Sequence, residues 1–130
     1  MIDELVGKEF PKIKGADMQL LVVDAKSPDG TADVVREKQK DYERVHLLSK
    51  EKGGLGADYV AGFKYAVDEL GADAVMEMDA DGQHKAVDTL KVAEKILDGY
   101  DLVIGVRRFC FLKSPTARIL TIFLKVTTLL

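Results

Sequence analysis

Short apolar runs alternate with amphipathic segments along this chain, and this alternation limits the folds that it can adopt. Four runs are rich in branched apolar residues and have the length of buried strands: residues 18–24, 44–49, 72–79 and 100–107. Four other segments carry apolar residues at helical spacing: residues 3–13, 32–42, 57–70 and 85–99. Strands that alternate with helices favour a mainly parallel sheet with helices on both faces. The sequence therefore predicts an α/β fold.

Composition excludes several classes of protein. The 130 residues suffice for one domain with a modest core, and the net charge of -3 does not favour a nucleic-acid partner, which usually needs a basic face. The single cysteine, Cys110, cannot form a disulfide within the chain and suits a reducing compartment. The first residues lack the pattern of a signal peptide, and no apolar run reaches the roughly 18 residues of a membrane span. We therefore expect a cytoplasmic protein.

The third apolar run ends on two aspartates, Asp79 and Asp81, with one small residue between them. Carboxylates placed in this way suit a hard divalent cation, and Gln83 offers a further oxygen two residues later. His84 could also bind a metal, but an oxygen-rich set favours Mg²⁺ or Mn²⁺ over zinc. A polar turn, with an aspartate capping the next helix, is the commoner explanation of an isolated Asp-x-Asp pair, although the position at a strand end and the adjoining Gln83 favour a metal site here. The motif alone leaves both interpretations open.

Other polar residues also follow predicted strands. Asp24 ends the first apolar run and Arg107 ends the last. Ligands of parallel α/β sheets bind outside the carboxyl ends of the strands, so these residues and the aspartate pair could converge on one crevice. Each has a simpler alternative: a turn for Asp24 and a solvated surface for Arg107. The glycine-rich residues 50–56 lack the ordered pattern of a P-loop.

Taken together, the motifs resemble one family. The stretches LLVVDAKSPDGTADVV, KGGLGADYVAGFKYAV, MDADGQH and DLVIGVRR occur in the order and at the spacing of the dolichol-phosphate mannosyltransferase branch of the family 2 glycosyltransferases. The resemblance covers residues 3–108. It implies the GT-A fold, a Rossmann-like sheet with helices on both faces. It also implies inverting transfer of mannose from GDP-mannose to dolichyl or another polyprenyl phosphate.

The resemblance also implies roles for individual residues. Asp79 and Asp81 match the family's catalytic aspartates and, with Gln83, would hold Mg²⁺ or Mn²⁺ against the diphosphate. Asp24 matches the aspartate that contacts the nucleoside, and Arg107 matches an arginine that contacts phosphate. The nucleotide-sugar-binding set implied in this way is Val22, Asp24, Gly56, Asp79, Ala80, Asp81 and Arg107.

The chain departs from the family pattern at several points. The family's first strand and its Pro-x-Tyr-x-Glu motif have no counterpart, so residues 1–108 are expected to form a partial GT-A domain. A sheet without that strand would leave unpaired backbone groups, which invites self-association. Ala25 stands where the family usually has a second aspartate, and Arg108 stands where it has an aromatic residue. Val106 replaces the usual hydroxyl residue.

Residues 109–130 are expected to form an amphipathic helical segment, with Arg118 and Lys125 among apolar residues. Two interpretations stand open: an interfacial helix that makes a peripheral contact with the cytoplasmic face of a membrane, or a core helix without its partner. Three functional alternatives also stand. They are a truncated, non-catalytic homologue, a family 2 transferase that uses another nucleotide sugar such as UDP-glucose, and an unrelated receiver-like module with an acidic metal pocket.

Overall fold

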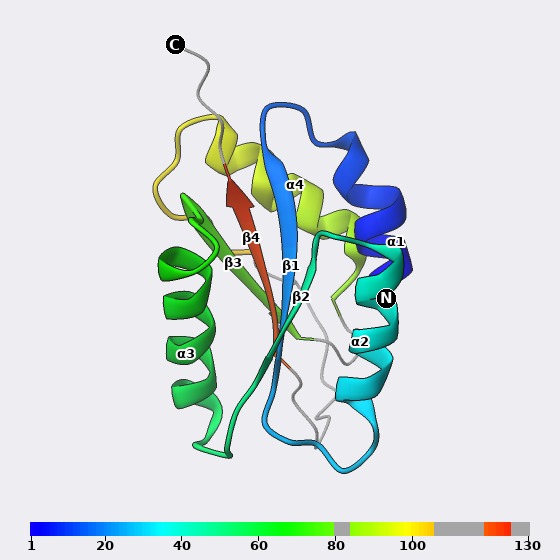
Figure 1. The fold of residues 1–130 in the computed structure, drawn as a ribbon. Coiled ribbons are helices and arrows are strands. Elements are labelled where there is room, and N and C mark those ends of the chain that lie inside the picture. The colour runs from blue at the N-terminus through cyan, green and yellow to red at the C-terminus, as the bar shows by residue number, and fades with distance from the viewer. Residues whose placement is uncertain (80–83, 106–118, 126–130) are drawn as a thin grey trace.

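The computed structural model describes residues 1–79, 84–105 and 119–125, with the backbone alone for the last range. These residues form a four-stranded sheet of strand order β2-β1-β4-β3 (Figure 1). The strands are β1 (Asp17–Asp24), β2 (Val45–Ser49), β3 (Ala74–Asp79) and β4 (Ile119–Lys125). Strands β1 and β2 are parallel, whereas β4 is antiparallel to both of its neighbours, β1 and β3. Therefore β1, β2 and β3 all run in the same direction.

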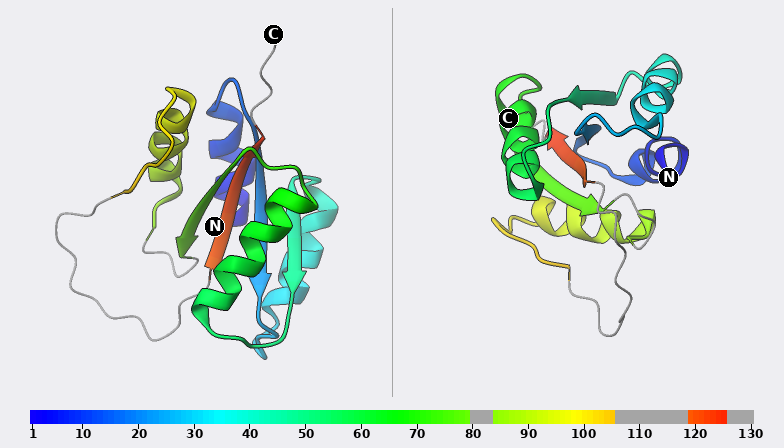
Figure 2. Two further views of the ribbon diagram at one scale, coloured as in Figure 1. Left: turned by 90° about the vertical axis from the view of Figure 1, so that its left-hand side faces the viewer. Right: turned by 90° about the horizontal axis from the view of Figure 1, so that it is seen from below.

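Helices cover both faces of this sheet, as predicted (Figure 2). The amino-terminal helical segment changes type along its length, from α1 (Ile2–Glu4) through the π-helical η1 (Leu5–Glu9) to the 3₁₀ turn η2 (Phe10–Lys12). This segment lies on one face together with α2 (Thr31–Asp41) and α4 (Ala86–Leu97). The other face is covered by α3 (Leu55–Asp68). No helix within the described ranges has both the length and the apolar character needed to cross a membrane.

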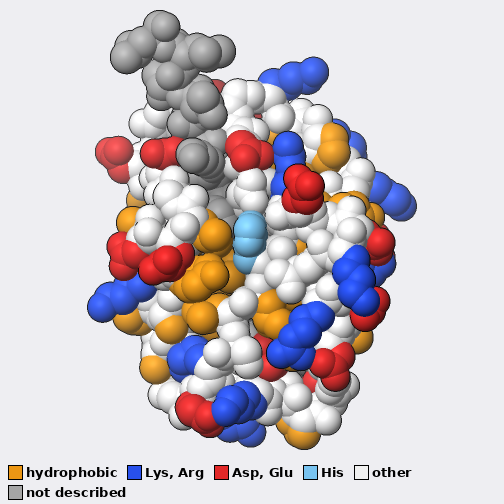
Figure 3. All heavy atoms as spheres, in the orientation of Figure 1, with side chains coloured by type: hydrophobic (Ala, Val, Ile, Leu, Met, Phe, Trp, Pro, Cys, Tyr) orange, Lys and Arg blue, Asp and Glu red, His pale blue; other side chains and the backbone are white. Residues whose placement is uncertain are grey.

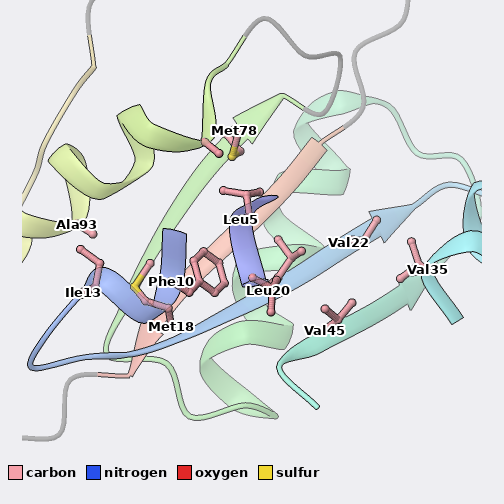
Figure 4. Packing of buried hydrophobic residues seen from close by; sticks show 12 residues of the cluster. Leu5, Phe10, Ile13, Met18, Leu20, Val22, Val35, Val45, Met78 and Ala93 are labelled. Carbon is pink, nitrogen blue, oxygen red and sulfur yellow. The ribbon is translucent and has the colours of Figure 1, made fainter. Parts of the chain in front are cut away.

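The core has two parts because β1 is buried on both sides. Leu20 and Val22 point into the larger cluster, and Leu21 and Val23 point into the smaller cluster with Ala66 of α3. This explains why residues 20–23 are continuously apolar rather than alternating. Figure 4 shows the larger cluster, in which the amino-terminal segment and α4 pack over the sheet: Leu5, Phe10, Ile13, Met18, Leu20, Val22, Val35, Val45, Met78 and Ala93.

Strand β4 corrects the prediction of a helical segment over residues 109–130. Residues 119–125 form a strand, while residues 109–118 and 126–130 lie outside the described ranges. The segment forms a strand because the backbone groups of the neighbouring strands need hydrogen-bond partners. Val22 of β1 and Met78 of β3 are both paired with Leu120, so β4 satisfies the facing N–H and C=O groups of two strands at once. The position between β1 and β3 is therefore filled, and the sheet is mixed, because its strands other than β4 run in one direction and both pairings of β4 are antiparallel.

The strand predicted over residues 100–107 is also wrong for its described part. Residues 100–105 form no strand, and Leu102 and Ile104 are 76% and 73% exposed. Since this stretch pairs with no described strand, its apolar side chains remain at the surface. Val106 and Arg107 lie outside the described residues.

The larger apolar residues of α3 are not the ones that it buries. Val60, Phe63 and Val67 are exposed, whereas the buried residues of this helix are Gly62 and Ala66. Small residues allow the helix to approach the sheet closely, and this packing overrides the larger apolar residues. In the view of Figure 3, hydrophobic side chains gather on the surface in the region of α3 and β2.

Candidate functional site

The carboxyl ends of the three parallel-running strands meet at one edge of the sheet, at the bottom of Figure 1. Asp24 ends β1 and is paired with Ser49 at the end of β2. Asp79 ends β3 and is paired with Ile119 of β4. Neighbouring strands lie about 4.8 Å apart, so one intervening strand places β1 and β3 roughly 10 Å from each other. The structure thus brings Asp24 and Asp79 to the same edge, as predicted, and their binding roles remain predictions.

Asp24 is buried, with 3% of its surface exposed, and its carboxylate closes the turn that follows β1. The two carboxylate oxygens accept the N–H of Ser27 at 3.2 and 3.4 Å. Lys26 has a left-handed φ of 53° and forms an ion pair with Glu51 in the loop after β2. In addition, the N–H of Lys50 donates to the Asp24 carbonyl oxygen at 3.0 Å. These contacts join the two loops at this edge.

Asp79 is half-buried, and its backbone N–H donates to Nδ1 of His84 at 2.9 Å. Side chains alternate along a strand, and Val75 packs against α3, so Glu77 and Asp79 point to the same side as α3. Burial raises the pKa of Tyr59 on α3, and the charges of Glu77 and Asp79 raise it further. Tyr59 therefore faces the acidic end of β3, a placement that no motif in the sequence indicated.

The amino-terminal end of α3 lies at the same edge. Gly54 precedes the helix with φ of 86°, and Gly56 is exposed in the first turn. Lys50 Nζ contacts Asp58 Oδ1 at 2.5 Å, and both side chains are mostly buried. Val22, another of the predicted binding residues, is 6% exposed, and its side chain belongs to the hydrophobic core.

The fit to a divalent cation depends on the oxygen donors. Asp79 supplies a half-buried carboxylate at the sheet edge, and Glu77 adds negative charge beside it. Within the described ranges, no three His, Cys, Asp or Glu side chains are grouped so that they could hold a metal. The other predicted ligands, Asp81 and Gln83, lie outside those ranges, as does Ala80. The donor set of two carboxylates and an amide nevertheless suits Mg²⁺ or Mn²⁺ by its chemistry.

A hollow of about 510 Å³ lies away from this edge. Its walls come from the amino-terminal segment and from the residues that precede β1 and β2, including Phe10, Ile13, Tyr42 and Arg44. Because it opens at the amino ends of the strands, it is separate from the Asp24 and Asp79 edge.

Comparison with known proteins identifies relatives. The family model described as glycosyl transferase family 2 matches residues 3–127. An undecaprenyl-phosphate mannosyltransferase of Micrococcus luteus is 42% identical over 93 residues, which cover 71% of this chain and 37% of the relative. A polyprenol monophosphomannose synthase of Mycolicibacterium smegmatis is 40% identical over 92 residues, covering 69% of this chain and 34% of the relative.

A more distant relative is the dolichol-phosphate mannosyltransferase of Pyrococcus furiosus, 35% identical over 107 residues, with 82% of this chain and 29% of the relative covered. The chain thus spans about a third of the length of these curated relatives. No solved structure gives a significant match to the chain.

Proposed function

The chain belongs to glycosyl transferase family 2, and on this basis we propose that it takes part in the transfer of mannose from GDP-mannose to dolichyl or another polyprenyl phosphate. The α/β sheet with helices on both faces agrees with the GT-A fold that the family resemblance implies. The names of the three relatives describe mannosyl transfer or synthesis with undecaprenyl, polyprenol and dolichol carriers. The identity of the donor, the identity of the acceptor and inversion at the sugar carbon are our proposals.

One observation carries this proposal. Val22 and Met78 are paired with the same residue of β4, so the acids that follow them, Asp24 and Asp79, end at one edge of the sheet. Ligands of open α/β sheets bind at this edge. The proposed donor site therefore combines a nucleoside contact at Asp24 with a diphosphate contact at the Asp79 motif.

The site residues would have different chemical roles. Asp79, Asp81 and Gln83 would hold Mg²⁺ or Mn²⁺, which neutralises negative charge on the departing diphosphate. The positive end of the α3 dipole adds to the same effect near Gly56. Arg107 would contact a phosphate oxygen. An oxygen of the lipid phosphate would attack the sugar carbon as the bond to GDP breaks, and because this oxygen is already anionic it needs little help from a base.

The lipid acceptor determines where the proposed reaction takes place. A polyprenyl chain is held in a membrane, so its phosphate lies at the membrane surface. We accordingly place the protein at the cytoplasmic face of a membrane through a peripheral contact. Binding of the chain to vesicles that contain polyprenyl phosphate, compared with vesicles that lack it, measures this contact.

Calorimetric titration of GDP-mannose into the chain, with and without Mn²⁺, tests the donor site. We expect binding that requires Mn²⁺ and that is lost in the Asp79→Ala/Asp81→Ala variant. The matched control is Glu94→Ala/Asp98→Ala, which removes the same charge from exposed positions at the far end of α4. This control should bind as the wild type does.

The other outcomes separate the alternatives. Tighter binding of UDP-glucose than of GDP-mannose would assign a different donor to the same site. A folded chain that binds neither nucleotide would be a non-catalytic homologue. Binding that persists in the Asp79→Ala/Asp81→Ala variant would contradict the proposed metal ligands.

A further inference from the structure

The side chain of His84 reaches back to the strand that carries the aspartate motif. Its Nδ1 accepts the backbone N–H of Asp79 at 2.9 Å. A ring nitrogen that accepts a hydrogen bond is unprotonated, so the proton of the neutral imidazole is on Nε2. The contact therefore connects the last residue of β3 with the residue that follows Gln83 in the sequence, and Asp81 and Gln83 lie in the chain between these two points.

The position of His84 is restrained because the start of α4 packs against β3. Ala86, the first residue of α4, is 4% exposed and belongs to the large core cluster. One turn later, Thr89 Oγ1 lies 3.7 Å from the sulfur of Met78, and both residues are buried. Met78 directly precedes Asp79. The helix start and the strand end are thus packed against each other, and His84, two residues before α4, adds a hydrogen bond to the strand end.

We propose that His84 is a positioning residue of the donor site, which holds the backbone at Asp79 so that the carboxylate of Asp79 stays oriented for binding. This inference rests on the proposed function. Groups that orient metal ligands through hydrogen bonds typically affect metal affinity by 10–100-fold when they are removed. His84 would act through Asp79, with Nδ1 occupied by the backbone contact.

Two variants of nearly equal size isolate the contact. In His84→Asn, the side-chain oxygen is bonded to Cγ as Nδ1 is in histidine, so it can accept the Asp79 N–H. His84→Leu has a similar shape and no acceptor. We expect His84→Leu to weaken Mn²⁺-dependent binding of GDP-mannose about tenfold or more, and His84→Asn to stay within about threefold of the wild type. Thermal midpoints of both variants control for a general loss of folding.

A second readout needs neither metal nor nucleotide. Nitrogen NMR of the wild-type imidazole should show the proton on Nε2. Hydrogen exchange at the Asp79 amide should be slow in the wild type and in His84→Asn, and about tenfold faster in His84→Leu, with the amides of β1 as an unchanged internal reference.

These measurements distinguish the positioning role of His84 from the proposed binding of GDP-mannose. The positioning role is overturned if His84→Asn binds as weakly as His84→Leu, or if exchange at Asp79 is the same in all three proteins. If the folded wild type binds no GDP-mannose, the proposed donor fails, and the exchange and tautomer measurements alone decide whether His84 holds Asp79.

Discussion

At the scale of single residues, His46 shows how partial burial changes a side chain that the motifs did not single out. Its Nε2 lies 2.9 Å from Oε1 of Gln19, and Nε2 of Gln19 donates to Asp17 at 2.7 Å. Asp17 is also 3.3 Å from Arg44, so the ring stands at one end of a polar chain that crosses from β1 to β2. Burial lowers the pKa of His46 below its usual value of 6.5. The folded state therefore favours the neutral ring.

This pKa shift predicts a dependence of stability on pH. The unfolded state takes up a proton at His46 first as the pH falls, so the stabilising contribution is complete above about pH 6.5 and is lost toward the lower folded pKa. Urea unfolding from about pH 8 to about pH 5 should show the free energy of unfolding falling more in the wild type than in His46→Gln. The glutamine keeps a donor for Gln19 and does not titrate. Parallel pH curves for the two proteins would contradict the assignment.

At the scale of elements, the start of α2 is held by a side chain that lies outside the helix. Thr31 is the first helical residue, and its N–H and hydroxyl both donate to Oδ1 of Asp29, at 3.1 and 2.6 Å. In the structure, the acceptor comes from Asp29, two residues earlier, because Gly30 adopts a left-handed φ of 79° that turns the chain back.

We expect Asp29→Ala to lower the free energy of unfolding by about 1 kcal/mol, the usual cost of losing a capping acceptor. Asp29→Asn retains a side-chain oxygen and should lose less. Thr31→Ala should also cost less than Asp29→Ala, because the backbone N–H at position 31 keeps its acceptor. Urea unfolding of the three variants measures the order. A larger loss of stability in Thr31→Ala than in Asp29→Ala would show that Thr31 is the capping residue.

At the scale of the whole molecule, the sheet depends on β4. This strand lies between β1 and β3 and pairs with both, so the two halves of the sheet meet through it. Its removal would leave the facing backbone groups of β1 and β3 without partners. Each such group costs about 1–3 kcal/mol when it stays buried, in a domain whose total stability is typically about 5–15 kcal/mol.

A chain that ends at residue 118 should therefore unfold or self-associate through its open strand edges, whereas a chain that ends at residue 125 keeps β4 and should behave as the full chain does. Light scattering after size-exclusion chromatography, with circular dichroism on heating, compares the two. A stable, monomeric chain ending at residue 118 would show that β4 is dispensable for the sheet.

Much of this protein was determined by the sequence itself. The three strands β1, β2 and β3 and the helices between them lie close to the predicted ranges, because a buried strand and an amphipathic helix each need a local pattern of apolar residues. The same pattern shows where the strands end, and hence that Asp24 and Asp79 reach one edge of the sheet. The motifs also predicted the family, which the comparison with known proteins bears out.

Only the tertiary structure decided the remaining features. An apolar segment such as residues 119–125 can form a helix or a strand, and the open backbone edges of β1 and β3 select the strand. The buried side of α3 is its small residues, Gly62 and Ala66, because close approach to the sheet matters more there than the size of an apolar side chain. The contact from His84 to Asp79 likewise depends on α4 packing against β3. Local periodicity specifies the conformation of a segment, whereas its partner is chosen by the backbone groups and packing surfaces that the rest of the fold leaves unsatisfied.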